Sequence, residues 1–312
     1  MKTRLIVDRF LQTVPVMLLA TVVVFGLLQL VPGDPAMVLA GEHATDERIQ
    51  QIRQLYGFDK SFFEQYGSWL SKAMQGDLSN SLLSSESVVR LIGQSFPHTL
   101  TVVVMALALS LIIGVPLGIL TATRSGTRTD AAISALSSVG VALPNFWLAM
   151  ILVSFFALRL NWLPATGATS ISENFWGAIR HSALPAMALA AAGISEVARQ
   201  LRSALLEVLS SQYVRTLRAK GLSESTILWR HGLKNVGVNL LTVVGLLFNR
   251  MLGGTVVVEA VFAIPGMGSL IVRAAINKDF PVVQGVVLSM VLVVVVTNFL
   301  IDMLYSRLDP RV

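Results

Sequence analysis

The sequence predicts an all-α integral membrane protein with six transmembrane helices and a small helical insertion on the periplasmic side. The 312 residues are 54% hydrophobic and only 13% charged, whereas soluble domains carry about 25% charged residues. A soluble domain of this composition would expose large apolar patches. Uncharged stretches run over 10–33, 91–123, 131–158 and 280–301. Each exceeds the roughly 20 residues that a helix needs to cross a bilayer.

Two further spans are interrupted by charge. One begins near Ala183 and contains Glu196, and the other begins near Val236 and contains Arg250. Glu196 is explained by an ion pair with Arg199 one helical turn later. With these two spans the chain crosses the membrane six times, so both termini lie on the same side.

The distribution of Lys and Arg orients these spans. Fourteen of these residues lie in the N-terminus, the 122–130 loop, the 199–235 segment and the tail, whereas four lie in the short loops on the other side. Because cytoplasmic loops are enriched in Lys and Arg, the N- and C-termini are predicted to be cytoplasmic. This asymmetry also accounts for the net charge of +6, so nucleic-acid binding is not needed to explain it.

Residues 1–33 are expected to form the first transmembrane helix, followed by a periplasmic helical segment over 34–97. A cleaved signal peptide is the alternative for the first span, but the apolar run is longer than the about 7–15 residues of such a peptide. Within the segment, Ser61 and Glu64 predict a capping box that starts an amphipathic helix. That helix either caps the span ends or forms a docking surface for an external partner. Its apolar face consists of Phe62, Phe63, Tyr66, Trp69, Leu70 and Ala73, and Gly76 ends it.

The 199–235 segment is much longer than a simple connection needs. Apolar residues recur at the helical period from Leu201 to Leu217, Gly221 ends this helix, and Ser223 can cap a second one. The pattern predicts a helix–turn–helix elbow with an apolar and a basic side. Such an elbow fits either an interfacial helix among acidic headgroups or a knob that enters a groove on another protein.

The chain has no motif for catalysis, nucleotide binding or metal binding. It contains no Cys, and its four His residues are scattered, with no two at helical metal-ligand spacing. The patterns G-x-x-x-x-G-K-[ST], H-E-x-x-H and G-x-S-x-G are all absent from the sequence. We therefore expect no catalytic residue, no metal site and no cofactor in this chain, and any ATP to be bound elsewhere.

Several stretches of the chain match one known family of membrane proteins. They are YVRTLRAKGLS at 213–223, WRHGLKN at 229–235, LVPGDP at 30–35, GGTVVVE at 253–259 with Phe262, PGMG at 265–268 and LDPR at 308–311. These stretches resemble permeases of the dipeptide, oligopeptide and nickel (also glutathione) family of bacterial ABC importers. The resemblance covers nearly the whole chain, and Pro-Gly-Asp-Pro with the long outer segment is similar to the first of the two permease subunits of such systems. It implies a type I importer transmembrane domain over 98–306 and a cytoplasmic tail over 307–312.

The resemblance also implies partners and a cargo in a prokaryotic cytoplasmic membrane. The partners are a second homologous permease subunit, two cytoplasmic ATP-binding subunits that bind ATP and Mg, and a periplasmic solute-binding protein. The cargo would be di- or oligopeptides, with nickel or glutathione as alternatives. In such permeases a loop like 199–235 docks into a cleft of the ATPase, and the docking residues carried over are Tyr213, Val214, Arg215, Leu217, Arg218, Ala219, Lys220, Gly221, Leu222 and Ser223.

The resemblance leaves open the roles of two residues, Arg250 and Asn239. Arg250 lies about 14 residues into the fifth span, where burying its charge costs several kcal/mol. It either lines the translocation path and meets a peptide carboxylate, or snorkels outward or pairs within the subunit interface. Asn239 stands where the family usually has a proline, which would bend the helix.

Two other classes of protein compete with the importer permease. An ion-coupled secondary transporter would show internal repeats and membrane-embedded carboxylates, and the predicted spans are almost free of carboxylates. A non-transporting membrane scaffold would need no pathway.

Overall fold

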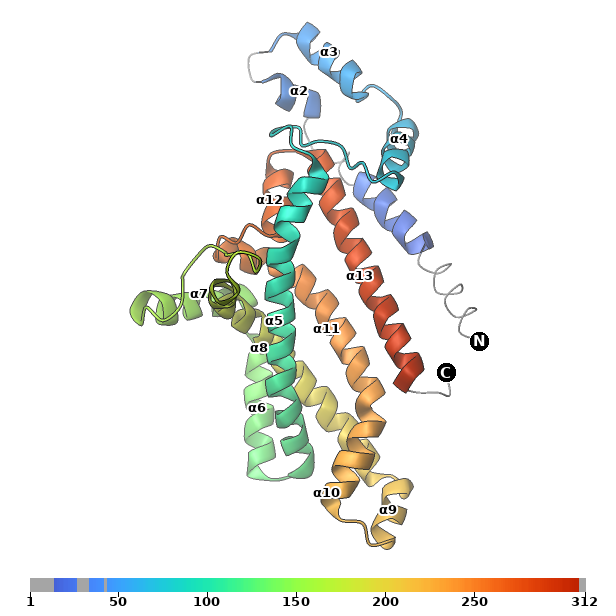
Figure 1. The fold of residues 1–312 in the computed structure, drawn as a ribbon, viewed down its shortest axis with the longest axis vertical. Helices are drawn as coiled ribbons and strands as arrows, with labels where there is room; N and C mark the ends of the chain where they lie inside the picture. The colour runs from blue at the N-terminus through green and yellow to red at the C-terminus, as the bar shows by residue number, and fades with distance from the viewer. Residues whose placement is uncertain (1–13, 27–33, 42–43, 309–312) are drawn as a thin grey trace. The chain divides into compact units, whose positions relative to one another are not determined.

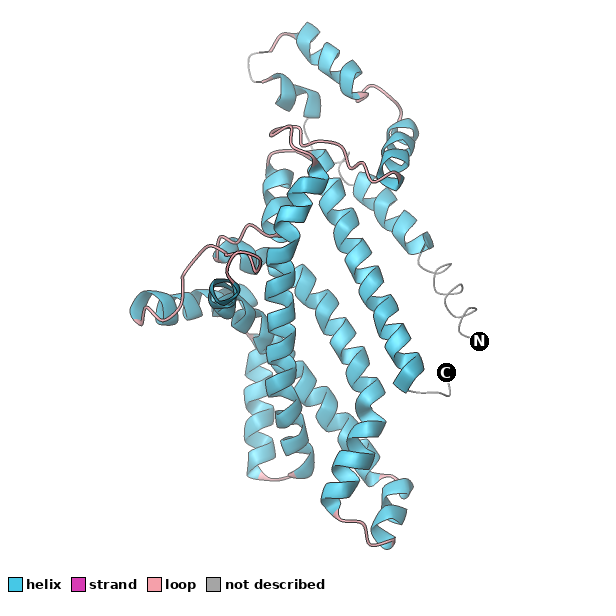
Figure 2. Cartoon of the chain, in the orientation of Figure 1, coloured by secondary structure: helices cyan, strands magenta, loops and turns pink. Residues whose placement is uncertain are grey.

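The computed structural model describes residues 14–26, 34–41 and 44–308, and these are mainly α-helical (Figure 2). No strand occurs in these three ranges, where one isolated bridge pairs Asn80 with Ser87. The predicted all-α fold class is therefore confirmed. Besides Val14–Gly26, the helices are α2 (Pro35–Ala40), α3 (Asp46–Tyr56), α4 (Phe62–Met74), α5 (Val88–Thr123), α6 (Arg128–Ala142), α7 (Asn145–Leu152), the π-helix η1 (Val153–Arg159), α8 (Phe175–Ser210), α9 (Gln212–Ala219), α10 (Glu224–Thr226), the π-helix η2 (Ile227–Gly232), α11 (Leu233–Val261), α12 (Met267–Ile276) and α13 (Phe280–Leu308) (Figure 1).

These helices form two compact units. The first unit comprises Met1–Pro97 and Pro265–Val296, and the second comprises His98–Ile264 and Thr297–Val312. Helices α5 and α13 each contribute residues to both units.

Three helices in the described ranges are long and apolar enough to cross a membrane by themselves. They are Val88–Thr123, Glu224–Val261 and Phe280–Tyr305. The expected first span is described only over Val14–Gly26, an apolar helix that is shorter than a span, and the rest of 1–33 lies outside the described residues.

The stretch 131–158, expected as one span, is instead two helical pieces that meet at 99°. The break falls at Leu143, whose backbone is extended (φ −79°, ψ 126°), and at Pro144, which starts α7. A proline disfavours the helical conformation of the residue before it, so α6 ends there. The sequence indicates that Pro144 permits a bend, but not that the bend is nearly a right angle.

The expected span after Ala183 lies in α8. This helix is long enough to cross a membrane, but it is not among the helices that are also apolar enough by composition. The helix is continuous through Pro185, and Arg199 pairs with Glu196 as expected. Its middle is nevertheless deeply buried in the second unit, and several of its buried residues are alanines. A span that packs against protein on most sides needs less hydropathy than one that faces lipid.

In the first unit, the predicted capping box at the start of α4 is confirmed. The Ser61 N–H donates to Glu64 Oε2 at 3.0 Å, and the Glu64 N–H donates to Ser61 Oγ at 3.4 Å. The aromatic face of α4 packs on Phe25, whose ring centroid lies 5.4 Å from that of Phe62 and 6.1 Å from that of Trp69. Phe63 does not belong to this packed face, because it is 80% exposed.

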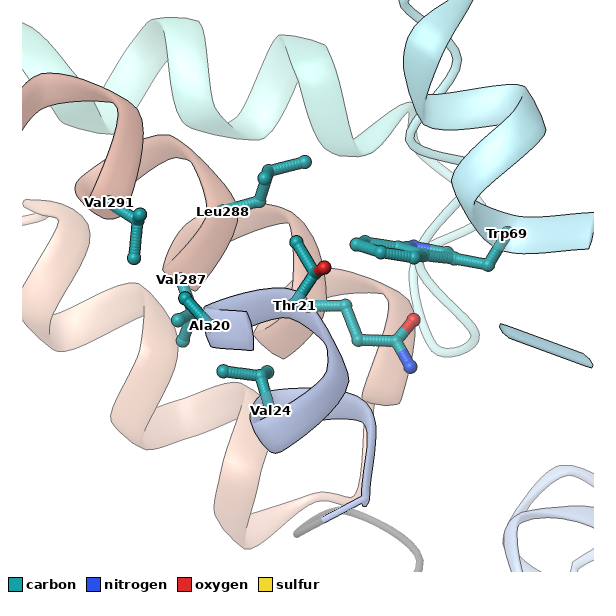
Figure 3. Close-up of a pocket in the computed structure, with 8 residues that line it drawn as sticks. Ala20, Thr21, Val24, Trp69, Val287, Leu288 and Val291 are labelled. Carbon is teal, nitrogen blue, oxygen red and sulfur yellow. The ribbon is translucent and has the colours of Figure 1, made fainter. Parts of the chain in front are cut away.

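Trp69 of this aromatic cluster lines a small cavity of about 10 Å³ in the first unit (Figure 3). Aliphatic side chains, Thr21 and Gln284 form the rest of its lining. A volume of this size holds about one water molecule, so the cavity is far too small for a transported peptide.

In the second unit, α5 packs on α8 through glycines. A Cβ atom on Gly114 would lie 2.9 Å from the Ile194 carbonyl oxygen, and one on Gly118 would lie 2.9 Å from the Ala198 carbonyl oxygen. The missing side chains therefore allow the two helices to approach closely. Nearby, α11 runs unbroken through Asn239, because asparagine keeps the backbone N–H that a proline would lack.

Candidate functional site: the elbow between α8 and α11

The elbow, defined as residues 211–232, begins with a break that the hydrophobic period does not reveal. One helix was expected from Leu201 to Gly221, but α8 ends at Ser210 because Ser211 is extended (φ −68°, ψ 156°). The Ser211 hydroxyl accepts the Val214 N–H at 3.4 Å and donates to the Val208 carbonyl oxygen at 2.7 Å. This hydroxyl therefore starts α9 as a separate short helix.

The predicted glycine turn closes α9. Gly221 adopts φ +80°, a left-handed conformation that costs a glycine little and most other residues more. The Gly221 N–H donates to the Arg218 carbonyl oxygen at 2.9 Å, and the Leu222 N–H donates to the Leu217 carbonyl oxygen at 3.2 Å. This pair of bonds is a Schellman motif, which satisfies carbonyl groups left free at the helix end.

On the far side of the turn, Ser223 caps α10 as predicted, accepting the Thr226 N–H at 3.3 Å. An ion pair clamps the two sides together. Arg218 Nε donates to Glu224 Oε1 at 2.6 Å and its Nη2 donates to Oε2 at 3.1 Å. Through these hydrogen bonds and its charge, the Arg218 guanidinium holds the pKa of the Glu224 carboxyl below its usual range.

Buried side chains hold the elbow against the rest of the second unit. Val214 and Ile227 are fully buried, and the Tyr213 hydroxyl contacts His231 Nδ1 at 2.7 Å. Leu228 packs against a core cluster that joins the end of α5, the second half of α8 and the start of α11: Ala122, Leu201, Ala204, Leu205 and Val236. The elbow is therefore continuous with the helix ends and is not a loose loop.

The remaining predicted docking residues divide by exposure. Leu217 and Leu222 are half-buried between the two short helices, whereas the other predicted residues, apart from the buried Val214, are exposed. In Figure 1, α9 and α10 lie together beyond the ends of α8 and α11. The exposed residues are Tyr213, Arg215, Arg218, Ala219, Lys220, Gly221 and Ser223, with Trp229 and Arg230 beside them.

A second feature of interest is an exposed stripe along α11 that contains Arg250. Its members recur every three or four residues, which places them on one face of the helix. Beside the stripe, Asn249 Nδ2 donates to Asn298 Oδ1 at 3.0 Å, and within it Thr242 is hydrogen-bonded to Tyr305. The stripe consists of Asn235, Asn239, Thr242, Leu246, Arg250, Gly253, Val257 and Ala260.

Two features of the second unit were missed at the level of sequence. Glu259 is fully buried at the end of α11 and accepts a hydrogen bond from the Thr99 hydroxyl, so one carboxyl group lies deep in the structure. Asp130 and Arg202 form an ion pair between α6 and α8. Both contacts join residues far apart in sequence, which no local pattern indicates. In the part of the chain that is described, no group of three or more His, Cys, Asp or Glu side chains is arranged to hold a metal ion.

Comparison with known proteins covers the full chain. The family model described as binding-protein-dependent transport system inner membrane component matches residues 114–312, and its N-terminal counterpart matches residues 2–110. A Brucella melitensis protein named as a peptide transport system permease is 39% identical over 100% of this chain and 99% of its own length. An oligopeptide transport system permease of Bacillus subtilis is 35% identical over 98% of both chains. A glutathione transport system permease of Escherichia coli is also 35% identical over 98% of both.

Among solved structures, a chain of the MetNI methionine ABC transporter in an inward-facing conformation shares the fold. The TM-score is 0.56 and the identity 19%, over 71% of this chain and 97% of that one. The helical fold and these relatives agree with one another. This chain belongs to the family of binding-protein-dependent transport system inner membrane components, and it is a non-catalytic, membrane-spanning permease subunit of an ABC importer.

Proposed function

We propose that this permease forms half of the translocation pathway for di- or oligopeptides. The second half comes from a homologous permease subunit, and an external solute-binding protein delivers the cargo. Two cytoplasmic ATPases bind ATP and Mg and drive the cycle. The peptide cargo is supported by relatives named as peptide, oligopeptide and dipeptide permeases over nearly their whole length. Glutathione, the cargo named for another relative, and nickel are the alternatives within the same class.

The observation that carries the coupling role is the construction of the elbow. A Schellman turn, a cap and a two-point ion pair hold α9 and α10 in one geometry, and a buried core ties them to three long helices. A connection that only joined two spans would need none of these. We therefore place the elbow in the cytoplasm, in a cleft of an ATPase, where nucleotide-driven closure displaces the helix ends and changes which side of the membrane the pathway faces.

Within the docking set, the side chains have two roles. Arg215, Ala219 and Lys220 are exposed and face the ATPase, whereas Val214 is fully buried and acts through the shape of the elbow. Arg218 is exposed and also clamps the turn through Glu224. A headgroup-binding helix, the competing interpretation, would bury its apolar face in the bilayer, whereas here Val214 and Ile227 are buried within the chain itself.

Arg250 is proposed to line the pathway. It sits on an exposed stripe that carries Asn239 and Thr242, in a helix whose buried residues are mainly apolar. Polar groups at such depth usually face a cavity or a partner. A peptide carboxylate is the substrate group that a guanidinium binds most strongly.

The Arg250 assignment is tested with Arg250→Leu, with Arg250→Lys as the charge-conserving control. Loss of one charged hydrogen bond costs about 1.5 kcal/mol, which is about tenfold in affinity. We expect the KM for dipeptide uptake to rise by about this factor in the Leu variant and less in the Lys variant. Unchanged uptake and unchanged substrate preference in Arg250→Leu would remove Arg250 from the pathway.

The function as a whole is tested by purification and uptake. The tagged chain is expected to copurify with two ATPases, and dipeptide uptake should stop when ATP is depleted. Uptake should survive a proton uncoupler while ATP is held constant. Uptake that follows the proton gradient instead would support a secondary transporter, and copurification without any uptake would support a scaffold.

A further inference from the structure

We infer that the Asp130–Arg202 ion pair transmits movement of the elbow to helix α6, which makes both side chains positioning residues for the coupling of transport to ATP hydrolysis. The inference rests on the proposed function, because it requires the elbow to be moved by an ATPase. Two observations support it: the geometry of the ion pair, and the helices and turns that Asp130 and Arg202 each contact.

The pair is a two-point contact between α6 and α8. Arg202 Nε donates to Asp130 Oδ1 at 2.8 Å, and Nη2 donates to Oδ2 at 2.7 Å. Asp130 is only 5% exposed. Two parallel hydrogen bonds between planar groups fix orientation as well as distance, so α6 and α8 are held in one register at this point.

The Asp130 carboxylate also organises the turn between α5 and α6. Its Oδ2 accepts the Gly126 N–H at 3.0 Å, and its Oδ1 accepts the Ser134 hydroxyl at 3.4 Å. The Asp130 N–H in turn donates to Thr127 Oγ1, which caps α6. A single side chain thus joins the α5–α6 turn, the first turns of α6 and the cytoplasmic half of α8.

The same region of α8 is attached to the elbow. Leu201 and Leu205 flank Arg202 and belong to the core cluster with Val236 of α11, against which Leu228 of the elbow packs. A displacement of the elbow therefore moves this part of α8. Because the two hydrogen bonds from Arg202 hold Asp130 to α8, the start of α6 must move with α8.

The ion pair is better suited to transmit movement from α8 to α6 than to stabilise the fold. The Arg202 side chain is 30% exposed, and ion pairs that reach solvent contribute little to stability. Replacing even a buried ion pair by packed apolar residues is often neutral or stabilising. What it supplies is a fixed geometry between two helices. At its other end α6 meets the 99° bend into α7, and α7 buries Ala149 and Leu152 in the second unit, so a displaced α6 has a joint about which to turn.

The test uses the complete importer, reconstituted in proteoliposomes with its binding protein, and measures ¹⁴C-labelled dialanine taken up per ATP hydrolysed. For Asp130→Asn and Arg202→Lys, we expect this ratio to fall at least about fivefold, the lower range of typical coupling between sites. Copurification of the ATPases should be unchanged. The matched control is Glu196→Gln, which removes an ion pair on the same helix that does not reach α6, and its ratio should stay at the wild-type value.

A second variant distinguishes a contact that stays closed from one that opens. The chain has no native Cys, so Asp130→Cys with Arg202→Cys can be joined by a short, reducible thiol cross-linker. If the contact transmits movement, cross-linking should restore the uptake per ATP that the double substitution lowers, and reduction should abolish it again.

Three results would overturn the inference. One is a wild-type ratio in both single variants, and another is a cross-link that blocks transport. The third is failure of both single variants to assemble while Glu196→Gln assembles, which would assign the pair to folding. Failure of the ATPases to copurify with the wild-type chain would instead count against the proposed function, so the two failures are distinguishable.

Discussion

The chain changes direction sharply at two places in the second unit, and the two are built differently. At the elbow, Gly221 turns the backbone in a left-handed conformation while Arg218 and Glu224 clamp the two sides. At the bend between α6 and α7, the extended Leu143 precedes Pro144, and no side chain caps the new helix.

This difference indicates two mechanical roles. A turn with a capping hydroxyl, a Schellman motif and an ion pair keeps its angle when it is pushed, because several bonds must break together. A proline break leaves carbonyl groups of the preceding turn without partners and has no side-chain bond across it. The elbow is suited to transmit a displacement, and the α6–α7 bend is suited to change its angle.

The largest effect is expected from Gly221→Val. A β-branched residue at φ +80° is a severe outlier, although no atom lies within 4 Å of the added Cβ, so the cost is purely conformational. We expect loss of both dipeptide uptake and ATPase copurification, with membrane insertion intact. Normal uptake by this variant would defeat the assignment of the elbow.

Two controls isolate this effect. Asn tolerates the left-handed conformation, so Gly221→Asn should keep most of the uptake. Gly76→Val places the same residue at φ +82° in equally open space of the first unit, and it should leave ATPase copurification unchanged.

An intermediate effect is expected from Pro144→Ala. Without the proline, Leu143 regains access to the helical conformation, so the α6–α7 angle should open. Distances between spin labels on cysteines introduced at the exposed positions Ala135 and Ser154 would report this change. Uptake should fall about threefold, less than the coupling losses typical of a broken link between sites, while ATPase copurification stays normal. An unchanged label distance would show that the surrounding packing sets the bend.

The smallest effect is expected for the pH dependence of the exposed Arg218–Glu224 ion pair. The pKa of Glu224 is held below its usual value of 4.5 by Arg218. The stabilisation is therefore fully present above the unfolded pKa of the carboxyl and is lost as the pH falls through its folded pKa. ATPase copurification should be flat between about pH 6 and 8 in both the wild type and Glu224→Gln. A loss of binding within that range in the wild type alone would contradict this account.

What the sequence predicts well is what is local. The capping box of Ser61 and Glu64, the turn at Gly221 and the cap at Ser223 each depend on residue types within four positions, and all three are present. The break at Ser211 was missed because the apolar period continues across it, so nothing in the hydrophobic pattern separates α8 from α9.

Contacts over long separations escape sequence reasoning for another reason. Asp130 and Arg202 lie 72 residues apart, and Thr99 and Glu259 lie 160 apart. Only the packing of whole helices brings such pairs together. In the same way, the sequence indicates that Pro144 permits a bend, but it does not give the 99° at which the two helical pieces meet.

The glycine contacts between α5 and α8 have a practical consequence for anyone who wishes to modify this protein. At Gly114 and Gly118 even a methyl group would collide with backbone atoms of α8, so these positions should be left out of mutational libraries and labelling schemes. Probes and affinity tags belong instead on outward-facing sites such as Phe63, which is 80% exposed and whose ring contact is with the neighbouring Phe62.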